Sequence, residues 1–237
     1  MANILLGVTG SVAAIKTPLL YEELKLAGHQ VKVVATRSAL YFFDPVQLDP
    51  SRSTRNPEVV VLDEDEWPGR DEGRRYARTD TVLHIELRRW ADLFLIAPLD
   101  ANTLAKLAVG LSDNCLTCVW RAWDSSRPVI LAPAMNTLMW THSLTARHLR
   151  QLALDSGPSP PESASTPEQL LDWINTHSSR LHIVSPESRL LACGDTGMGA
   201  MAGLERLLAA VSRFLSSPRG QEREDSHETE AARDRRE

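Results

Sequence analysis

The chain has 237 residues, of which 43% are hydrophobic, and a formal charge of -5 at pH 7. This length can form one α/β domain, or two small ones, with a substantial core, and the acidic balance lacks the basic footprint of a nucleic-acid-binding protein. No apolar run approaches the ~20 residues of a membrane span, and the N-terminus lacks the basic region and cleavage site of a signal peptide. Three cysteines do not make a disulfide framework, so we expect a cytoplasmic protein.

Short apolar segments alternate with helical stretches along most of the chain. We expect strands at residues 4–8, 30–35, 58–62, 93–97 and 128–132. Helices are expected at 12–27, where Gly28 can end the helix, from about residue 101, and at 137–152. Because strands that are apolar on both faces are typical of a parallel sheet covered by helices, the predicted fold class is α/β.

The later part of the chain contains two peripheral segments. Residues 157–165 have the composition of a loop, and the capping-box order Thr166-Pro167-Glu168-Gln169 predicts a short helix to about Asn175. Residues 218–237 are charged and almost free of apolar side chains, which is typical of a disordered tail. We therefore predict one folded domain over residues 1–217.

Three of the predicted strands are followed by similar polar turns. Gly10-Ser11 opens a helix, an arrangement that favours a phosphate group but also occurs as an ordinary tight turn. Asn102 and Asn136 follow two later strands, where each can be a helix cap or a ligand contact. Because parallel sheets bind ligands at the carboxyl ends of their strands, we expect these turns to converge on one crevice.

Two side chains are candidates for acid–base chemistry. His84 can be a general base, although an isolated histidine is more often structural. Cys193 lies in a glycine-rich loop that could approach a ligand closely, or it is a buried cysteine beside a tight turn. Cys115 and Cys118 form a C-x-x-C pair without a second pair, which predicts helix packing. The histidines show no metal-ligand spacing, and no metal site is predicted.

Five segments together carry a family signature. They are residues 7–14, 84–92, 97–106, 133–140 and 192–195. In this order they strongly resemble the eukaryotic phosphopantothenoylcysteine decarboxylases, which belong to the homo-oligomeric flavin-containing cysteine decarboxylases. The likeness covers roughly residues 3–150 and 183–215.

The resemblance implies a flavodoxin-like (Rossmann-type) fold, a three-layer parallel sheet with helices on both faces. It implies FMN bound between the subunits of a homotrimer, which could also include paralogues. The implied reaction converts 4'-phosphopantothenoylcysteine to 4'-phosphopantetheine in coenzyme A biosynthesis through thioaldehyde and enethiolate intermediates. No nucleic acid or membrane partner is implied.

The resemblance also assigns roles to individual residues. His84 would be the base and Cys193 the proton donor. The FMN contacts would be Gly10, Ser11, Val12, Thr36, Ser38, Arg89, Asp100, Ala101, Asn102, Thr103 and Ala134. The substrate contacts would be Asn136, which would hold the carboxylate, with Met139, Arg189, Ala192 and Met201.

The chain departs from the family pattern at several places, of which three bear on the site. Asp100 stands where relatives more often have serine, so its carboxylate would either hydrogen-bond the cofactor or repel its phosphate. Leu190 stands where relatives tend to carry a basic residue for the substrate phosphate, a role that Arg189 could take. Residues 153–180 form an insertion.

Two alternatives remain open. One is a flavin-dependent decarboxylase of the C-terminal cysteine of a peptide. The other is a regulatory subunit that inhibits a protein phosphatase, as some fungal relatives are, although those relatives tend to have strongly acidic tails. Residues 218–237 mix acidic residues with arginines, and His84, Asn136 and Cys193 are all present, so catalysis is favoured.

Overall fold

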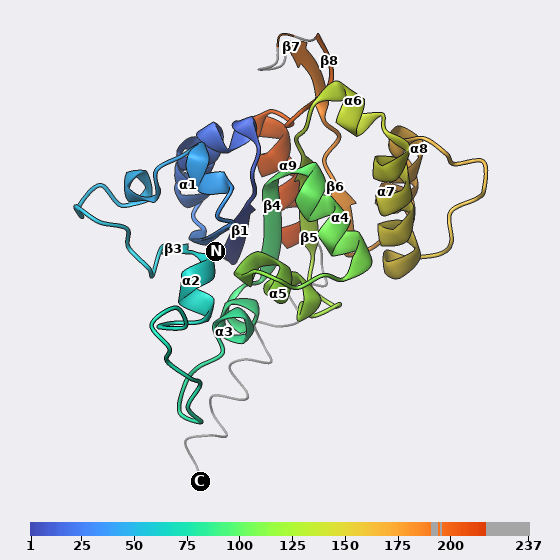
Figure 1. Ribbon diagram of the computed structural model, residues 1–237. Coiled ribbons are helices and arrows are strands. Elements are labelled where there is room, and N and C mark those ends of the chain that lie inside the picture. The colour runs from blue at the N-terminus through green and yellow to red at the C-terminus, as the bar shows by residue number, and fades with distance from the viewer. Residues whose placement is uncertain (191–193, 195, 217–237) are drawn as a thin grey trace.

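The computed structural model describes residues 1–190, 194 and 196–216 and is built on a six-stranded parallel sheet (Figure 1). In chain order the strands are β1 (Asn3–Val8), β2 (Gln30–Ala35), β3 (Val60–Val61), β4 (Leu93–Leu99), β5 (Val129–Pro133) and β6 (Leu181–Ile183). In space the order is β3-β2-β1-β4-β5-β6. All five predicted strands are therefore confirmed, and β6 was not expected.

Helices cover both faces of this sheet, because each strand buries side chains on both sides. The 3-10 helix η1 (Val12–Lys16), α1 (Thr17–Leu26) and α9 (Leu204–Leu215) pack with one face, where Leu6 joins the core. On the other face, where Leu5 joins the core, lie α3 (Leu83–Trp90), α4 (Ala101–Val109), α5 (Cys115–Arg121), α7 (Ser143–Ser156) and α8 (Pro167–His177). The predicted three-layer α/β fold is confirmed.

The expected helix at 12–27 forms in two pieces. Ser11 caps η1, and α1 then begins with Pro18 in its first turn. Proline is accepted there because the first turn does not use its missing N–H group. The helix ends before Gly28, whose φ of +86° is the left-handed conformation that glycine adopts at helix ends, as expected.

The expected helix at 137–152 is also divided, and here the prediction of one helix was wrong. The short helix α6 (Thr137–Trp140) ends before His142, whose Nδ1 accepts a hydrogen bond from the N–H of Leu144 and so caps α7. The cap begins a new helix instead of continuing the old one. By contrast, α8 begins with the capping box that the sequence predicted, formed by Thr166 and Gln169.

A two-stranded hairpin projects from the main sheet beside α6 (Figure 1). Its strands are β7 (Glu187–Leu190) and β8 (Thr196–Ala200), where the sequence indicated a glycine-rich loop. Gly199 has a φ of +133°, and a Cβ atom there would overlap the carbonyl oxygen of Met135. The hairpin is thus seated directly on the chain that follows β5. Residues 191–193 and 195, including Ala192 and Cys193, lie outside the described residues, as does the 217–237 segment.

The remaining short elements are η2 (Ala39–Tyr41), η3 (Pro45–Leu48) and α2 (Asp63–Glu66). Across the ranges that the structure describes, the helices are too short or too polar to cross a lipid bilayer.

Candidate functional site

The turns after β1 and β4 are joined by a buried threonine. The sheet order places these strands side by side, with connections leaving in opposite directions, and such a switch point forms the ligand crevice of open α/β sheets. Thr9 Oγ1 donates to the carbonyl oxygen of Pro98 at 2.8 Å and accepts from the N–H of Asp100 at 2.7 Å. Because Thr9 is completely buried, these two bonds fix the relative position of the turns.

The turn after β2 reaches the same point. A Cβ atom on Gly10 would lie 2.5 Å from Ser38 Oγ and 3.4 Å from an Asp100 carboxylate oxygen, so a side chain here would force Ser38 to move. The hydroxyl groups of Ser38 and Thr36 lie 3.1 Å apart. The structure therefore brings together predicted cofactor contacts from three separate strand ends.

A pocket of about 430 Å³ opens beside these turns, and we call it the crevice pocket. Its walls are polar, with hydroxyl, amide and charged groups. The residues that line it are Thr36, Arg37, Ser38, Asp63, Asn102, Thr103, Lys106, Asp113 and Asn114.

The acidic side chains of the crevice pocket already have partners. Asp113 holds the Lys106 ammonium at 2.7 Å, and Asp63 accepts the backbone N–H groups of Arg37 and Cys115. Burial raises the pKa of Asp63 above that of an ordinary carboxyl. Asp100 accepts the N–H of Thr103 at 2.7 Å as the N-cap of α4, so its carboxylate serves the role in which serine is also favoured.

His84 lies in the first turn of α3 and is held by a buried glutamate of α2. Its Nδ1 is 2.5 Å from Glu66 Oε1, and its backbone N–H donates to Glu66 Oε2 at 3.0 Å. Arg89, further along α3, pairs with Glu86 at 2.9 Å. Sequence reasoning missed Glu66, because nothing in the spacing of the acidic residues at 63–66 distinguishes it from a solvent-exposed glutamate.

Asn136 caps α6 beside the hairpin. Its Oδ1 accepts the N–H of Leu138 at 2.8 Å, and a Cβ atom on Gly197 would lie 2.6 Å from Thr137 Oγ1, so β8 presses against α6. The next residue along α6 that was predicted to contact substrate, Met139, is 48% exposed.

The other predicted contacts occupy varied positions. Arg189 donates to Glu187 at 2.8 Å within β7, and Leu190 beside it is exposed. Val12 is exposed on η1, whereas Ala134 and Met201 are 3% exposed and pack in the core. Little of the Met201 side chain is therefore available to a ligand in this chain alone.

Two groups of predicted catalytic and substrate residues remain apart. His84 belongs to α3, which packs on α2 and α5, whereas Asn136 belongs with α6, which packs on β8. Figure 1 shows α3 and α6 on opposite sides of the molecule. One copy of the chain does not bring His84 and Asn136 together.

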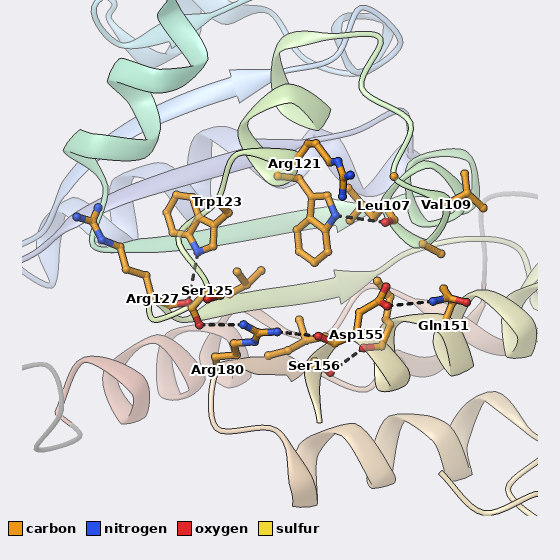
Figure 2. Close-up of a pocket in the computed structure, with 16 residues that line it drawn as sticks. Leu107, Val109, Arg121, Trp123, Ser125, Arg127, Gln151, Asp155, Ser156 and Arg180 are labelled. Atoms are coloured by element: carbon orange, nitrogen blue, oxygen red, sulfur yellow. Dashed lines mark hydrogen bonds between the residues drawn. The ribbon is translucent and has the colours of Figure 1, made fainter. Parts of the chain in front are cut away.

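A second pocket, of about 480 Å³, lies at the other end of the sheet, and we call it the opposite pocket (Figure 2). It is formed where α4, α5 and α7 end and where β5 and β6 begin. Arg180 donates there to the carbonyl oxygens of Ser125 and Asp155, and the Trp120 indole donates to that of Leu107. Arg180 is a cation beside the carboxyl end of α7, where a positive charge stabilises the helix, and the Trp120 bond joins α5 to α4.

Comparison with known proteins gives one consistent picture. The family profile described as "Flavoprotein" matches residues 1–216. The phosphopantothenoylcysteine decarboxylase of Mus musculus is 43% identical over 90% of this chain and 87% of its own length.

Two solved structures are similar over most of the chain. A PPC decarboxylase mutant complexed with pantothenoylaminoethenethiol has a TM-score of 0.70 and 40% identity, covering 91% of this chain and 99% of that one. The FMN binding protein AtHal3 has a TM-score of 0.66 and 42% identity, covering 91% and 97%.

Proposed function

The chain belongs to the flavoprotein family, in the branch of the phosphopantothenoylcysteine decarboxylases, and from this we propose that it decarboxylates 4'-phosphopantothenoylcysteine to 4'-phosphopantetheine with FMN as cofactor. The observation that carries the proposal is the convergence of Gly10, Ser38 and Asp100 beside a polar pocket at the switch point of the sheet. The name of the Mus musculus relative supports the decarboxylation, and the switch point of an open α/β sheet is where such folds bind ligands, which supports the site.

The donors of the crevice pocket fit the phosphate and hydroxyl groups of FMN. The hydroxyl groups of Thr36 and Ser38 and the amide of Asn102 line it, and Gly10 lets the backbone approach closely. Lys106 compensates the charge of Asp113, and the Asp63 carboxylate already accepts two backbone N–H groups, before an anion enters. We assign the remaining predicted cofactor residues, Ser11, Val12, Arg89, Ala101, Thr103 and Ala134, to the same ligand.

The chain's own residues bind the substrate and transfer its protons. When bound, FMN supplies the reversible hydride acceptor that an unactivated cysteine carboxylate needs before CO₂ can leave. His84 accepts the proton of the substrate thiol, a role worth roughly 10²–10⁴-fold in rate. The amide of Asn136 donates to the carboxylate, and Cys193 returns a proton to carbon. Ala192, Met139, Arg189 and Met201 are the further substrate contacts.

We also propose that the active form is a homotrimer in the cytoplasm, with each site completed by a neighbouring copy. The separation of His84 from Asn136 within one chain supports this arrangement. Exposed apolar side chains on η1 and α1, which are Val12, Ile15 and Leu19, offer a surface for such contacts.

The test uses the full chain. The purified protein should show the yellow absorbance of bound flavin and release CO₂ from phosphopantothenoylcysteine.

Cys193→Ser should stop at an oxidised enethiol, and normal turnover by that variant would exclude Cys193 as the donor. A mixture of His84→Asn and Cys193→Ser chains, refolded together, should regain activity if sites combine two copies. Colourless protein that takes up no added FMN and releases no CO₂ would refute the proposal.

A further inference from the structure

Glu66 is a charged residue in a position where burial needs an explanation. Its side chain is 4% exposed, and its carboxylate is directed at His84 with both oxygens. Oε1 lies 2.5 Å from the ring Nδ1, and Oε2 accepts the backbone N–H of the same residue at 3.0 Å. Burying a carboxylate is costly unless its oxygens are hydrogen-bonded.

The surroundings of Glu66 leave His84 as its main ionisable partner. Cys115 is a neighbour whose Sγ lies 3.6 Å from Oε2, and the charge of Glu66, after burial, also raises the pKa of the nearby Cys118 thiol. Burial, with the adjacent negative charge of Glu66, raises the pKa of the Cys115 thiol, so the thiol stays protonated and donates. A plain capping role would account for the bond to the backbone N–H but not for the oxygen at the ring.

The short helix that carries Glu66 is fixed by two of its other carboxylates. The Asp65 carboxylate accepts two hydrogen bonds from the Arg55 guanidinium group, of 2.6 and 2.9 Å, and it also accepts one from the backbone N–H of Leu62. Asp63 accepts the N–H of Cys115 at 3.2 Å. The Glu66 carboxylate is therefore held in place before any ligand arrives.

We propose that Glu66 is a positioning residue that accepts the Nδ1–H of His84 and so keeps Nε2 as the nitrogen able to take a proton from the substrate thiol. The hydrogen bond made by one ring nitrogen decides which nitrogen of a histidine is protonated, and this sets what the other can do. The histidine side chain is 23% exposed, so the ring remains accessible to a ligand. The proposal rests on the proposed function for the identity of that ligand.

The first experiment reads the tautomer without any substrate. Protein labelled with ¹⁵N in its histidines is examined by long-range ¹H–¹⁵N NMR, and the His84 signals are assigned by their loss in His84→Gln. In the unmodified chain, Nδ1 should carry the proton and Nε2 should not. Glu66→Gln should lose this preference, because its amide can donate to Nδ1. A His84 ring protonated on Nε2 alone in the unmodified chain would overturn the proposal.

The second experiment separates positioning from folding. Glu66→Gln should lower kcat about 10–100-fold while KM changes less than about threefold, since the residue acts through the base and not on substrate binding. Asp65→Asn is the matched control, because it removes a carboxylate from the same short helix without touching His84. It should lower stability and reduce kcat less than Glu66→Gln does, because Glu66 keeps its own bonds to His84.

The outcomes distinguish the two proposals. Equal losses of kcat in Asp65→Asn and Glu66→Gln, or an unchanged kcat in Glu66→Gln, would refute the positioning role. If the unmodified chain shows no decarboxylation, the proposed function fails, whereas the NMR result still decides whether Glu66 fixes the tautomer.

Discussion

The crevice pocket and the opposite pocket have similar volumes, about 430 and 480 Å³, but different walls. Helix α4 begins at the first and ends at the second. At its start, hydroxyl and amide groups from several strand ends face a common space. At its end, Arg180 and Trp120 donate to carbonyl oxygens of the protein itself. Volume therefore does not distinguish the proposed ligand site from the opposite pocket, whereas the kinds of groups that line the two pockets do.

Adding one methyl group at each pocket should give the largest difference in FMN affinity between the two pockets. Gly10→Ala would place a Cβ atom 2.5 Å from Ser38 Oγ and 2.7 Å from Ser38 Cβ, so the loop after β2 must move. Overpacking of this kind costs about 1–3 kcal/mol, and we expect FMN affinity to fall about 10–100-fold. Titration of the flavin-free protein, followed by flavin fluorescence, measures this.

Gly110→Ala is the matched control in the opposite pocket. Gly110 has a φ of +74° but ample space, since the nearest atom to an added Cβ is 3.8 Å away. We expect a loss of stability of about 1 kcal/mol from backbone strain, with unchanged FMN affinity. Equal affinity losses in both glycine variants would show that the pockets are not functionally distinct.

A smaller effect should come from the hydrogen bonds that build each pocket. Thr9→Val removes the hydroxyl that joins Pro98 to Asp100 and leaves a buried N–H without its acceptor. We expect about 1–3 kcal/mol of lost stability, together with weaker FMN binding. Urea denaturation and flavin titration of the same samples measure the two effects.

Trp120→Phe offers the comparison at the opposite pocket, because it removes one bond to the Leu107 carbonyl. It should cost about 1 kcal/mol of stability and leave FMN affinity as it was. An affinity loss in Trp120→Phe as large as that in Thr9→Val would contradict the assignment of the crevice pocket.

The smallest effect concerns β6, which begins at the opposite pocket. Burial, with Arg213 beside it, lowers the pKa of His182 to about 4. Because the unfolded chain binds the proton near pH 6.5 and the folded chain does not, stability should fall as pH drops from about 6.5 to about 4. After allowance for solvent screening of the part-exposed ring, about 1 kcal/mol is expected. Urea denaturation at pH 7 and pH 5 should show a smaller change in His182→Gln; an identical change would exclude His182 as the source.

Local patterns in the sequence were enough to predict most of the central sheet and its turns. Apolar runs marked the strands, Gly28 marked a helix end, and the Thr166–Gln169 capping box marked the start of α8. The hairpin strand β7 was missed because it is short, mostly polar and exposed, and β8 was missed because its two glycines are typical of a loop. The division between α6 and α7 was missed because the cap at His142 interrupts an otherwise helical pattern.

The sequence by itself determined most of the segments that become strands and helices, and the polar turns that follow the strands, since these depend on residues close together in the chain. Only the tertiary structure decided which turns meet. Thr9 and Asp100 are 91 positions apart and Glu66 and His84 are 18 apart. Their contacts depend on the order of the strands in the sheet and on how α2, α3 and α5 pack, which no local spacing encodes.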